Sequence, residues 1–148
     1  MRITEVMANP SFAQGGQDKG EFVELFNLSE DPVDLTGWRI ADRETTDQII
    51  AWEADAAPVV PGLTFAVIFD PDFDPDGADS YGPLDPEVVW LRPGNNRIGN
   101  GLGMRERLSL VDPSGAVVDT YTSPGGARSG VSYERRDFAE GDVESNWR

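Results

Sequence analysis

The sequence has no cysteine and no histidine among its 148 residues, and Lys19 is its single lysine. Without cysteine there can be no disulfide, thiol nucleophile or thiolate zinc site, and without histidine no imidazole can act as general base. A carboxylate-pair hydrolase is the one enzyme class that the composition leaves open. With 27 acidic residues, chance pairs of carboxylates are inevitable, so they give no specific signal. We therefore expect no enzymatic activity.

Basic residues and long apolar runs are also scarce. The chain has 12 Lys and Arg against 27 Asp and Glu, a formal net charge of -15. Binding to phosphate backbones or anionic lipid requires basic side chains, so this balance disfavours nucleic acid and membrane surfaces as partners. No apolar run approaches the roughly 20 residues of a membrane span, which predicts no membrane insertion. The opening residues Met1 to Val6 have a β-like pattern rather than that of a signal peptide.

The apolar residues form short runs separated by clusters of Gly, Pro, Asn and Asp. Each run is rich in β-branched and aromatic residues, and none continues with the spacing of an amphipathic helix. The runs are Ile3 to Met7, Phe22 to Leu28, Trp38 to Ile40, Gln48 to Trp52, Leu63 to Phe69, Val88 to Leu91, Leu108 to Val111, Val117 to Tyr121 and Val131 to Tyr133. Asp112-Pro113-Ser114-Gly115 lies between two runs and predicts a hairpin turn. The pattern predicts an all-β sandwich or barrel of about eight or nine strands.

Three segments in the first third of the chain resemble the lamin-tail domain, most closely the version in secreted bacterial proteins. They are Ile3 to Pro10, Gly20 to Asn27 and Val33 to Ile40. Later pieces agree with the resemblance: Pro61-Gly62, the Leu108 to Val118 hairpin, and Ser132 to Arg135 followed by Asn146-Trp147. The resemblance covers nearly the whole chain, although Asp70 to Gly103 carries little signal.

The resemblance implies an immunoglobulin-like β-sandwich of mostly antiparallel strands, with residues 1–148 forming one domain and no catalytic site. In bacteria such domains are usually modules of larger exported proteins, so we expect this chain to be excised from one. The expected role is interaction or attachment, outside the cell or at its surface. Another protein or a cell-surface polymer is the expected partner, and an exposed edge strand would also let two copies pair.

Residues Phe22 to Asn27 predict a central strand whose two faces are both largely apolar. Phe22, Glu24 and Phe26 face one side, while Val23 and Leu25 face the other. Glu24 is then a half-buried carboxylate between phenylalanines, and it needs a partner such as an arginine, backbone N–H groups or a metal. We expect an ion pair or a turn-closing hydrogen bond rather than catalysis.

Two tryptophans are expected to be structural. Trp38 predicts a core aromatic between the sheets, and Trp147 is expected to close one end of the sandwich.

An acidic loop is the strongest candidate for a ligand site. Asp72, Asp74 and Asp76 followed by Gly77 have the D-x-D-x-D-G spacing of a calcium loop, and Asp79 could supply a further carboxylate. Position twelve holds Pro83 instead of the bidentate glutamate, and no helices flank the loop, which excludes an EF-hand. Two interpretations remain open: a weak surface calcium site or a solvated acidic loop. A calcium-dependent module that binds carbohydrate or protein through Asp70 to Asp79 is therefore the alternative function, and calcium is the one cofactor considered.

The glycine-rich segment Gly94 to Gly103 has part of a phosphate-loop spacing. Asn100-Gly101 stands where that loop requires lysine followed by serine or threonine. We expect a surface loop and no nucleotide.

Overall fold

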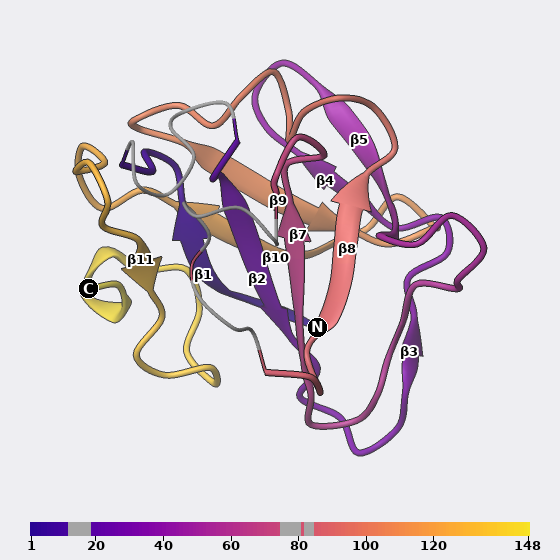
Figure 1. Cartoon of the computed structure of the whole chain (residues 1–148). Helices are drawn as coiled ribbons and strands as arrows, with labels where there is room; N and C mark the ends of the chain where they lie inside the picture. The colour runs from indigo at the N-terminus through magenta and orange to yellow at the C-terminus, as the bar shows by residue number, and fades with distance from the viewer. Residues whose placement is uncertain (12–18, 75–80, 82–84) are drawn as a thin grey trace.

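The computed structural model describes residues 1–11, 19–74, 81 and 85–148, and it is built from short β-strands (Figure 1). The strands are β1 (Arg2–Met7), β2 (Phe22–Phe26), β3 (Val33–Asp34), β4 (Arg39–Ala41), β5 (Thr46–Ala51), β6 (Val59–Val60), β7 (Phe65–Phe69), β8 (Val89–Pro93), β9 (Arg107–Val111), β10 (Val117–Thr122) and β11 (Tyr133–Glu134). A short 3-10 helix, η2 (Glu144–Asn146), precedes the C-terminus. Every predicted run overlaps a strand, whereas the two-residue strands β3 and β6 were not predicted. No helix in the described part of the chain is long and apolar enough to cross a membrane.

The nine-stranded sheet has the order β10-β9-β4-β5-β8-β7-β2-β1-β11, and β3 pairs with β6 separately. β5 belongs to two layers, because Thr46 to Gln48 pairs with β4 while Ile49 to Ala51 pairs with β8. The sheet curls about this strand, so that β10, β9 and β4 face β1, β2 and β7 across the core (Figure 1). In the described residues, the β7–β8 pair is parallel and the other ladders are antiparallel. This confirms the predicted immunoglobulin-like sandwich of mostly antiparallel strands.

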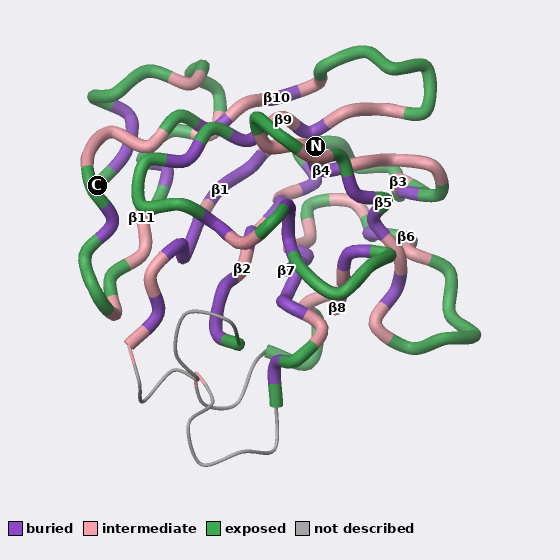
Figure 2. Tube along the Cα trace, turned by 90° about the horizontal axis from the view of Figure 1, so that it is seen from above, coloured by how far each residue is buried: buried purple, intermediate pink, exposed green. Residues whose placement is uncertain are grey.

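The core lies between the two layers, where the purple stretches of Figure 2 converge. Ile3, Leu25 and Ile68 fill it from one layer, while Leu108 and Leu110 fill it from the other. Alternate residues of each strand point inward because the side-chain period of a strand is two. β2 lies between β1 and β7, which confirms the prediction that it is central. Trp38 is only partly buried and packs against this core.

The turn between β9 and β10 has the predicted hairpin geometry. The Gly115 N–H donates to the Asp112 carbonyl at 3.0 Å, and the Asp112 carboxylate accepts the N–H of Ser114 at 2.9 Å. Gly115 has a φ of 89°, a left-handed conformation that glycine adopts without a steric penalty. Together these features fix the antiparallel pairing of β9 with β10.

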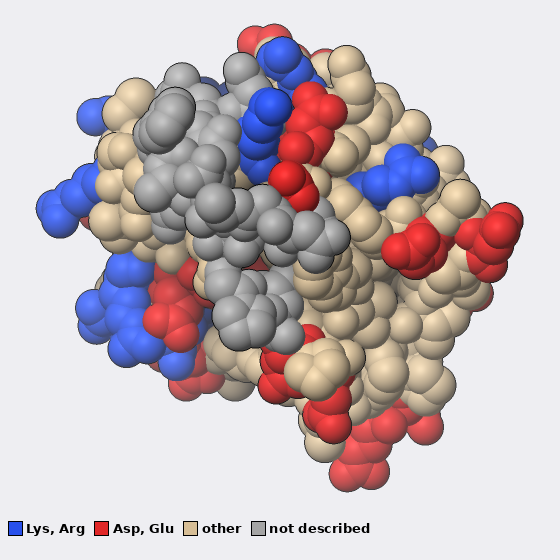
Figure 3. All heavy atoms as spheres, viewed as in Figure 1, with Lys and Arg blue, Asp and Glu red and all other residues tan. Residues whose placement is uncertain are grey.

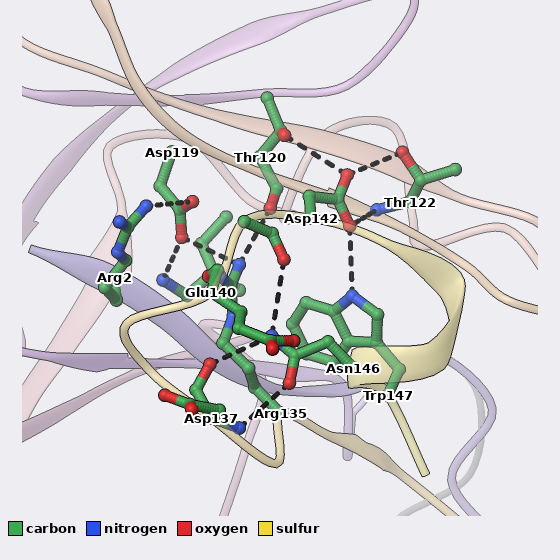
Figure 4. Close-up of polar contacts among 12 residues, drawn as sticks. Arg2, Asp119, Thr120, Thr122, Arg135, Asp137, Glu140, Asp142, Asn146 and Trp147 are labelled. Atoms are coloured by element: carbon green, nitrogen blue, oxygen red, sulfur yellow. Dashed lines mark hydrogen bonds and ion pairs between the residues drawn. The ribbon is translucent and has the colours of Figure 1, made fainter.

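Residues near the C-terminus close one end of the sandwich, as expected for Trp147. The Trp147 ring is 4% exposed and meets Tyr121 edge to face at 4.8 Å between centroids. The Arg135 guanidinium lies 4.8 Å from the same ring centroid. Arg135 Nη2 also donates to Asp119 Oδ2 and to the Thr120 carbonyl, each at 3.0 Å (Figure 4). The segment that follows β11 is thereby tied to β10, at the opposite end of the sheet order.

Candidate functional site

The outer face of β2, β7 and β8 carries a second apolar cluster, separate from the core. We call it the aromatic face; its residues are Phe22, Trp52, Val67, Phe69, Phe73, Tyr81, Val88 and Trp90. It arises from alternation, because Ala66 and Ile68 of β7 point into the core while Val67 and Phe69 point outward. An outer sheet face that meets water is normally polar, so this cluster needs a cover or a partner.

Part of that cover comes from the segment between β7 and β8. Phe73 stacks on Phe69 with centroids 4.3 Å apart and an interplanar angle of 7°. Tyr81 meets Phe22 edge to face at 5.3 Å, and its hydroxyl donates to the Gly20 carbonyl at 2.6 Å. Burial raises the pKa of Tyr81, so this hydroxyl remains a donor at neutral pH. The middle of the aromatic face is therefore structural.

A hollow of about 380 Å³ remains beside β8. It is lined by Ala51, Trp52, Glu53, Ala56, Ala57, Val89 and Trp90, and we call it the indole hollow. The two indole rings are 5.9 Å apart at 75°, and the backbone N–H of Trp52 donates to the backbone carbonyl of Trp90 at 3.0 Å. Figure 3 shows an uncharged area over β8 with both acidic and basic side chains beside it.

Four acidic residues flank this hollow in the chain. Glu53 lines it, Asp55 lies in the same turn, and Asp85 and Glu87 directly precede β8. All four are exposed. Among the described residues, the carboxylates that form ion pairs are those of Asp119 and Glu134. None of the four acidic residues near the hollow forms an ion pair there. In the structure Glu53 is the carboxylate that lines the hollow, and the other three acidic residues lie close in sequence to its lining residues.

A row of three glutamates crosses the same outer face. Glu5 is opposite Glu24 on one side and Glu134 on the other. Burial raises the pKa of Glu24 to about 7. The hydrogen bond from Thr4 opposes this rise, and the charges of Glu5 and Glu134 add to it. Burial likewise raises the pKa of Glu5, whose carboxylate accepts a hydrogen bond from the Ser132 hydroxyl.

The sequence predicted that Glu24 is half-buried and needs a partner. The partner is the Thr4 hydroxyl, 2.7 Å from Glu24 Oε1, rather than an arginine, backbone N–H groups or a metal. Thr4 was not foreseen because the register of β1 against β2 shifts between Ile3 and Glu5, and that shift brings Thr4 toward Glu24.

The predicted calcium loop is described only at its start. Asp72 and Asp74 are exposed, while Asp76 and Asp79 lie outside the described residues. The Asp72 N–H donates to the Asp70 carboxylate at 2.9 Å, which begins the loop with a turn. No group of three or more potential metal ligands occurs within the described ranges. The calcium site, with its four aspartates, therefore stays a prediction.

The glycine-rich segment is held by carboxylates of the chain itself. Backbone N–H groups that would face an anion in a phosphate loop already have partners here. Gly99 donates to Asp47 at 2.7 Å, and Leu102 donates to Glu21 at 2.9 Å. Sequence analysis missed these anchors because the partners are 52 and 81 residues away.

Both edge strands of the large sheet have neighbours that limit pairing with another copy. The Thr122 N–H of β10 donates to the Asp142 carboxylate at 2.9 Å, and Glu134 of β11 exchanges two backbone hydrogen bonds with Arg148, each 3.0 Å. An edge-strand dimer stays a prediction, and it would require another part of either edge.

The two-layer arrangement of mostly antiparallel strands places this chain in the class of immunoglobulin-like β-sandwich modules. The chain is a member of the lamin tail domain family, whose family model matches residues 1–125. The immunoglobulin-like fold of this family is generally non-catalytic. Residues 126–148 follow the matched part and supply β11, Arg135 and Trp147.

The chain is also similar to a γ-glutamyl phosphate reductase of Rhodopirellula baltica. The identity is 36% over 78 residues, which are 52% of this chain. The chain spans 18% of the length of that relative, so the similarity concerns a small part of the reductase.

Proposed function

We propose that this chain is a non-catalytic interaction or attachment module of a larger exported bacterial protein. It would act outside the cell or at its surface and bind another protein or a cell-surface polymer. The indole hollow is the observation that carries this proposal, because it exposes tryptophan surface that the other described residues leave uncovered.

The position of the hollow supports a binding role over a structural one. Trp52 and Trp90 are only partly buried, whereas the neighbouring Phe69 is 1% exposed. Indole rings in a concave surface are typical anchors for a partner, because they bury a large apolar area with few rotatable bonds. The net charge of -15 supports partners other than nucleic acid and anionic lipid.

Two findings support a modular role for residues 1–148. Trp147 and Arg135, which follow the matched residues, pack against β10 and close one end of the sandwich. The similar region of the Rhodopirellula baltica relative is 18% of a longer protein. Both are compatible with a self-contained domain that serves a larger chain.

Calcium-dependent binding through Asp70 to Asp79 is the alternative form of the same role. Asp72, Asp74, Asp76 and Asp79 would hold the ion. Binding to carbohydrate or protein would then require calcium and would be abolished by EDTA, which separates this alternative from a hollow that works without metal.

The proposal is tested by adding fluorescently labelled domain to washed bacterial cells and to their exported proteins. We expect retention that Trp90→Ser reduces and that Val117→Ser, at a 58%-exposed position on β10, leaves unchanged. Thermal melting must first show that both variants are folded. Equal retention of both variants would place the binding elsewhere, and no retention of the wild type on any fraction would contradict an attachment role.

A further inference from the structure

The indole hollow combines an apolar floor with one carboxylate at its border. Alanine, valine and tryptophan side chains form the floor, and Glu53 contributes the carboxylate. We propose that this hollow receives a lysine or arginine side chain from a basic segment of a partner protein. The inference rests on the proposed function, since it names the chemistry of the partner at the same surface.

The indole rings suit the two parts of a basic side chain. Its methylene stem can lie against Val89 and the alanines, while its charged end meets a ring face. Trp52 and Trp90 stand at 75° to each other, so a group in the hollow can contact the face of one ring and the edge of the other. A cation over an indole face is stabilised by the ring quadrupole.

The charges around the hollow favour the same partner. Glu53, Asp55, Asp85 and Glu87 have no ion pair among the described residues, and the whole chain has 27 acidic against 12 basic residues. Arg92 lines an adjoining hollow together with Glu53, and its Nε donates to the Trp52 carbonyl at 3.3 Å. It therefore lies beside Trp52 without forming an ion pair with Glu53. A basic segment is complementary to this border, and an acidic one is repelled.

A neutral sugar fits the hollow less well. Apart from the indole N–H groups, Glu53 is the one polar side chain among the described residues that line it. A sugar ring presents several hydroxyls, each of which would lose water without gaining a partner on this floor. The charged end of a lysine or arginine can stay hydrated at the exposed border, where Glu53 can pair with it while the methylene stem covers the floor.

The test uses the four tryptophan indole N–H signals in a proton–nitrogen NMR spectrum. The probes are the peptide Gly-Lys-Gly-Arg-Gly-Lys-Gly, a matched peptide with glutamine at each basic position, and cellohexaose. In 150 mM NaCl, where charges are screened beyond about 8 Å, we expect the basic peptide to shift the signals of Trp52 and Trp90. Trp38 and Trp147 serve as internal controls, because they belong to the core and its end.

Paired variants separate the hollow from the overall charge. Ala56→Arg places a basic side chain in the hollow, and Ala139→Arg makes the same charge change at another exposed site. We expect Ala56→Arg to weaken peptide binding at least about tenfold and Ala139→Arg less than about twofold. Glu53→Gln should weaken it about threefold to fivefold, with Glu140→Gln as its control.

The outcomes distinguish the two proposals. Equal shifts from the basic and glutamine peptides, or equal effects of Ala56→Arg and Ala139→Arg, would overturn the basic partner. Shifts of Trp52 and Trp90 with cellohexaose alone would also overturn it, but they would keep the binding role of the hollow. If no probe moves Trp52 or Trp90, the basic partner is overturned, and cell retention that Trp90→Ser does not reduce would then overturn the hollow as the binding site.

Discussion

Arg135 and Asp119 form an ion pair of 3.0 Å in which the side chains are 0% and 3% exposed. The pair joins the segment after β11 to β10 across the closed end of the sandwich (Figure 4). Arg2 reaches the other oxygen of Asp119 at 3.0 Å, and the Ile3 N–H donates to Asp119 Oδ2 at 2.8 Å. Asp119 thus holds three separate segments together.

Removing Arg135 should destabilise the domain strongly, because the Asp119 charge would remain buried. We expect Arg135→Leu to lower the free energy of unfolding by about 3 kcal/mol. This is the low end of the range for breaking a buried ion pair, because Arg2 would still pair with Asp119. Arg148→Leu is the matched control: its pair with Glu134, at 2.7 Å, is exposed and should contribute less than about 1 kcal/mol. Urea unfolding of both variants measures the difference, and equal losses would contradict a special role for Asp119.

Stability should fall as pH rises because of Glu24. Its folded pKa of about 7 lies above the ordinary value of 4.5, so the folded state holds the proton more tightly than the unfolded state. The stabilising contribution is complete below about pH 4.5 and is lost as pH rises through about 7.

Glu24→Gln keeps the acceptor for Thr4 and removes the titration. After allowance for solvent around this partly exposed group, we expect the variant to be about 1–2 kcal/mol more stable than wild type at pH 8. Near pH 5 the two proteins should be similar. Urea unfolding at both pH values checks this, and an unchanged difference between pH 5 and pH 8 would mean that Glu24 does not titrate in this range.

Gly62 marks a close approach between two turns. A Cβ on Gly62 would lie 2.0 Å from the Glu30 carbonyl oxygen, a backbone atom that cannot move aside cheaply. We expect Gly62→Ala to destabilise the domain by at least about 3 kcal/mol, and Gly126→Ala, with open space around it, to change stability by less than about 1 kcal/mol. Thermal melting distinguishes them, and equal melting temperatures would contradict this contact.

The calcium prediction has a simple thermal test. If the dissociation constant is near 1 mM, 10 mM Ca²⁺ should add about 1.4 kcal/mol and raise the melting temperature by roughly 3–5 °C. Mg²⁺ and matched NaCl are the controls, and EDTA gives the baseline. Asp74→Asn and Asp76→Asn should abolish a specific rise. The same rise in NaCl would mean that salt only screens the surplus negative charge.

The sequence predicted the strands far better than the surface. The strands within the runs from Ile3 to Tyr133 could be predicted locally, because short runs rich in β-branched and aromatic residues are typical of β-strands. β3 and β6 were missed, since two residues are too few to show any period and, unlike β11, neither strand overlaps an apolar run. The turn at Asp112 was predictable because its chemistry is contained in four consecutive residues.

The candidate site depends on contacts between distant parts of the chain. Trp52 ends one predicted run and Trp90 lies in the region with little family signal, so nothing local places them 5.9 Å apart. Nothing in the local sequence indicates that Arg135 is buried, and arginine is seldom fully buried, yet it is 1% exposed. The proximity of Trp52 and Trp90 follows from the pairing of β5 with β8. The burial of Arg135 follows from the packing of the C-terminal segment against β10.

The sharing of β5 between the layers has a consequence for how the domain opens. Gln48 pairs with β4 and Ile49 begins the pairing with β8, so the layers meet between adjacent residues. The layers cannot separate unless β5 loses its hydrogen bonds to β4 or those to β8. The amide protons of β5 should therefore exchange with solvent only when the whole domain unfolds, and the module should open as one cooperative unit rather than layer by layer.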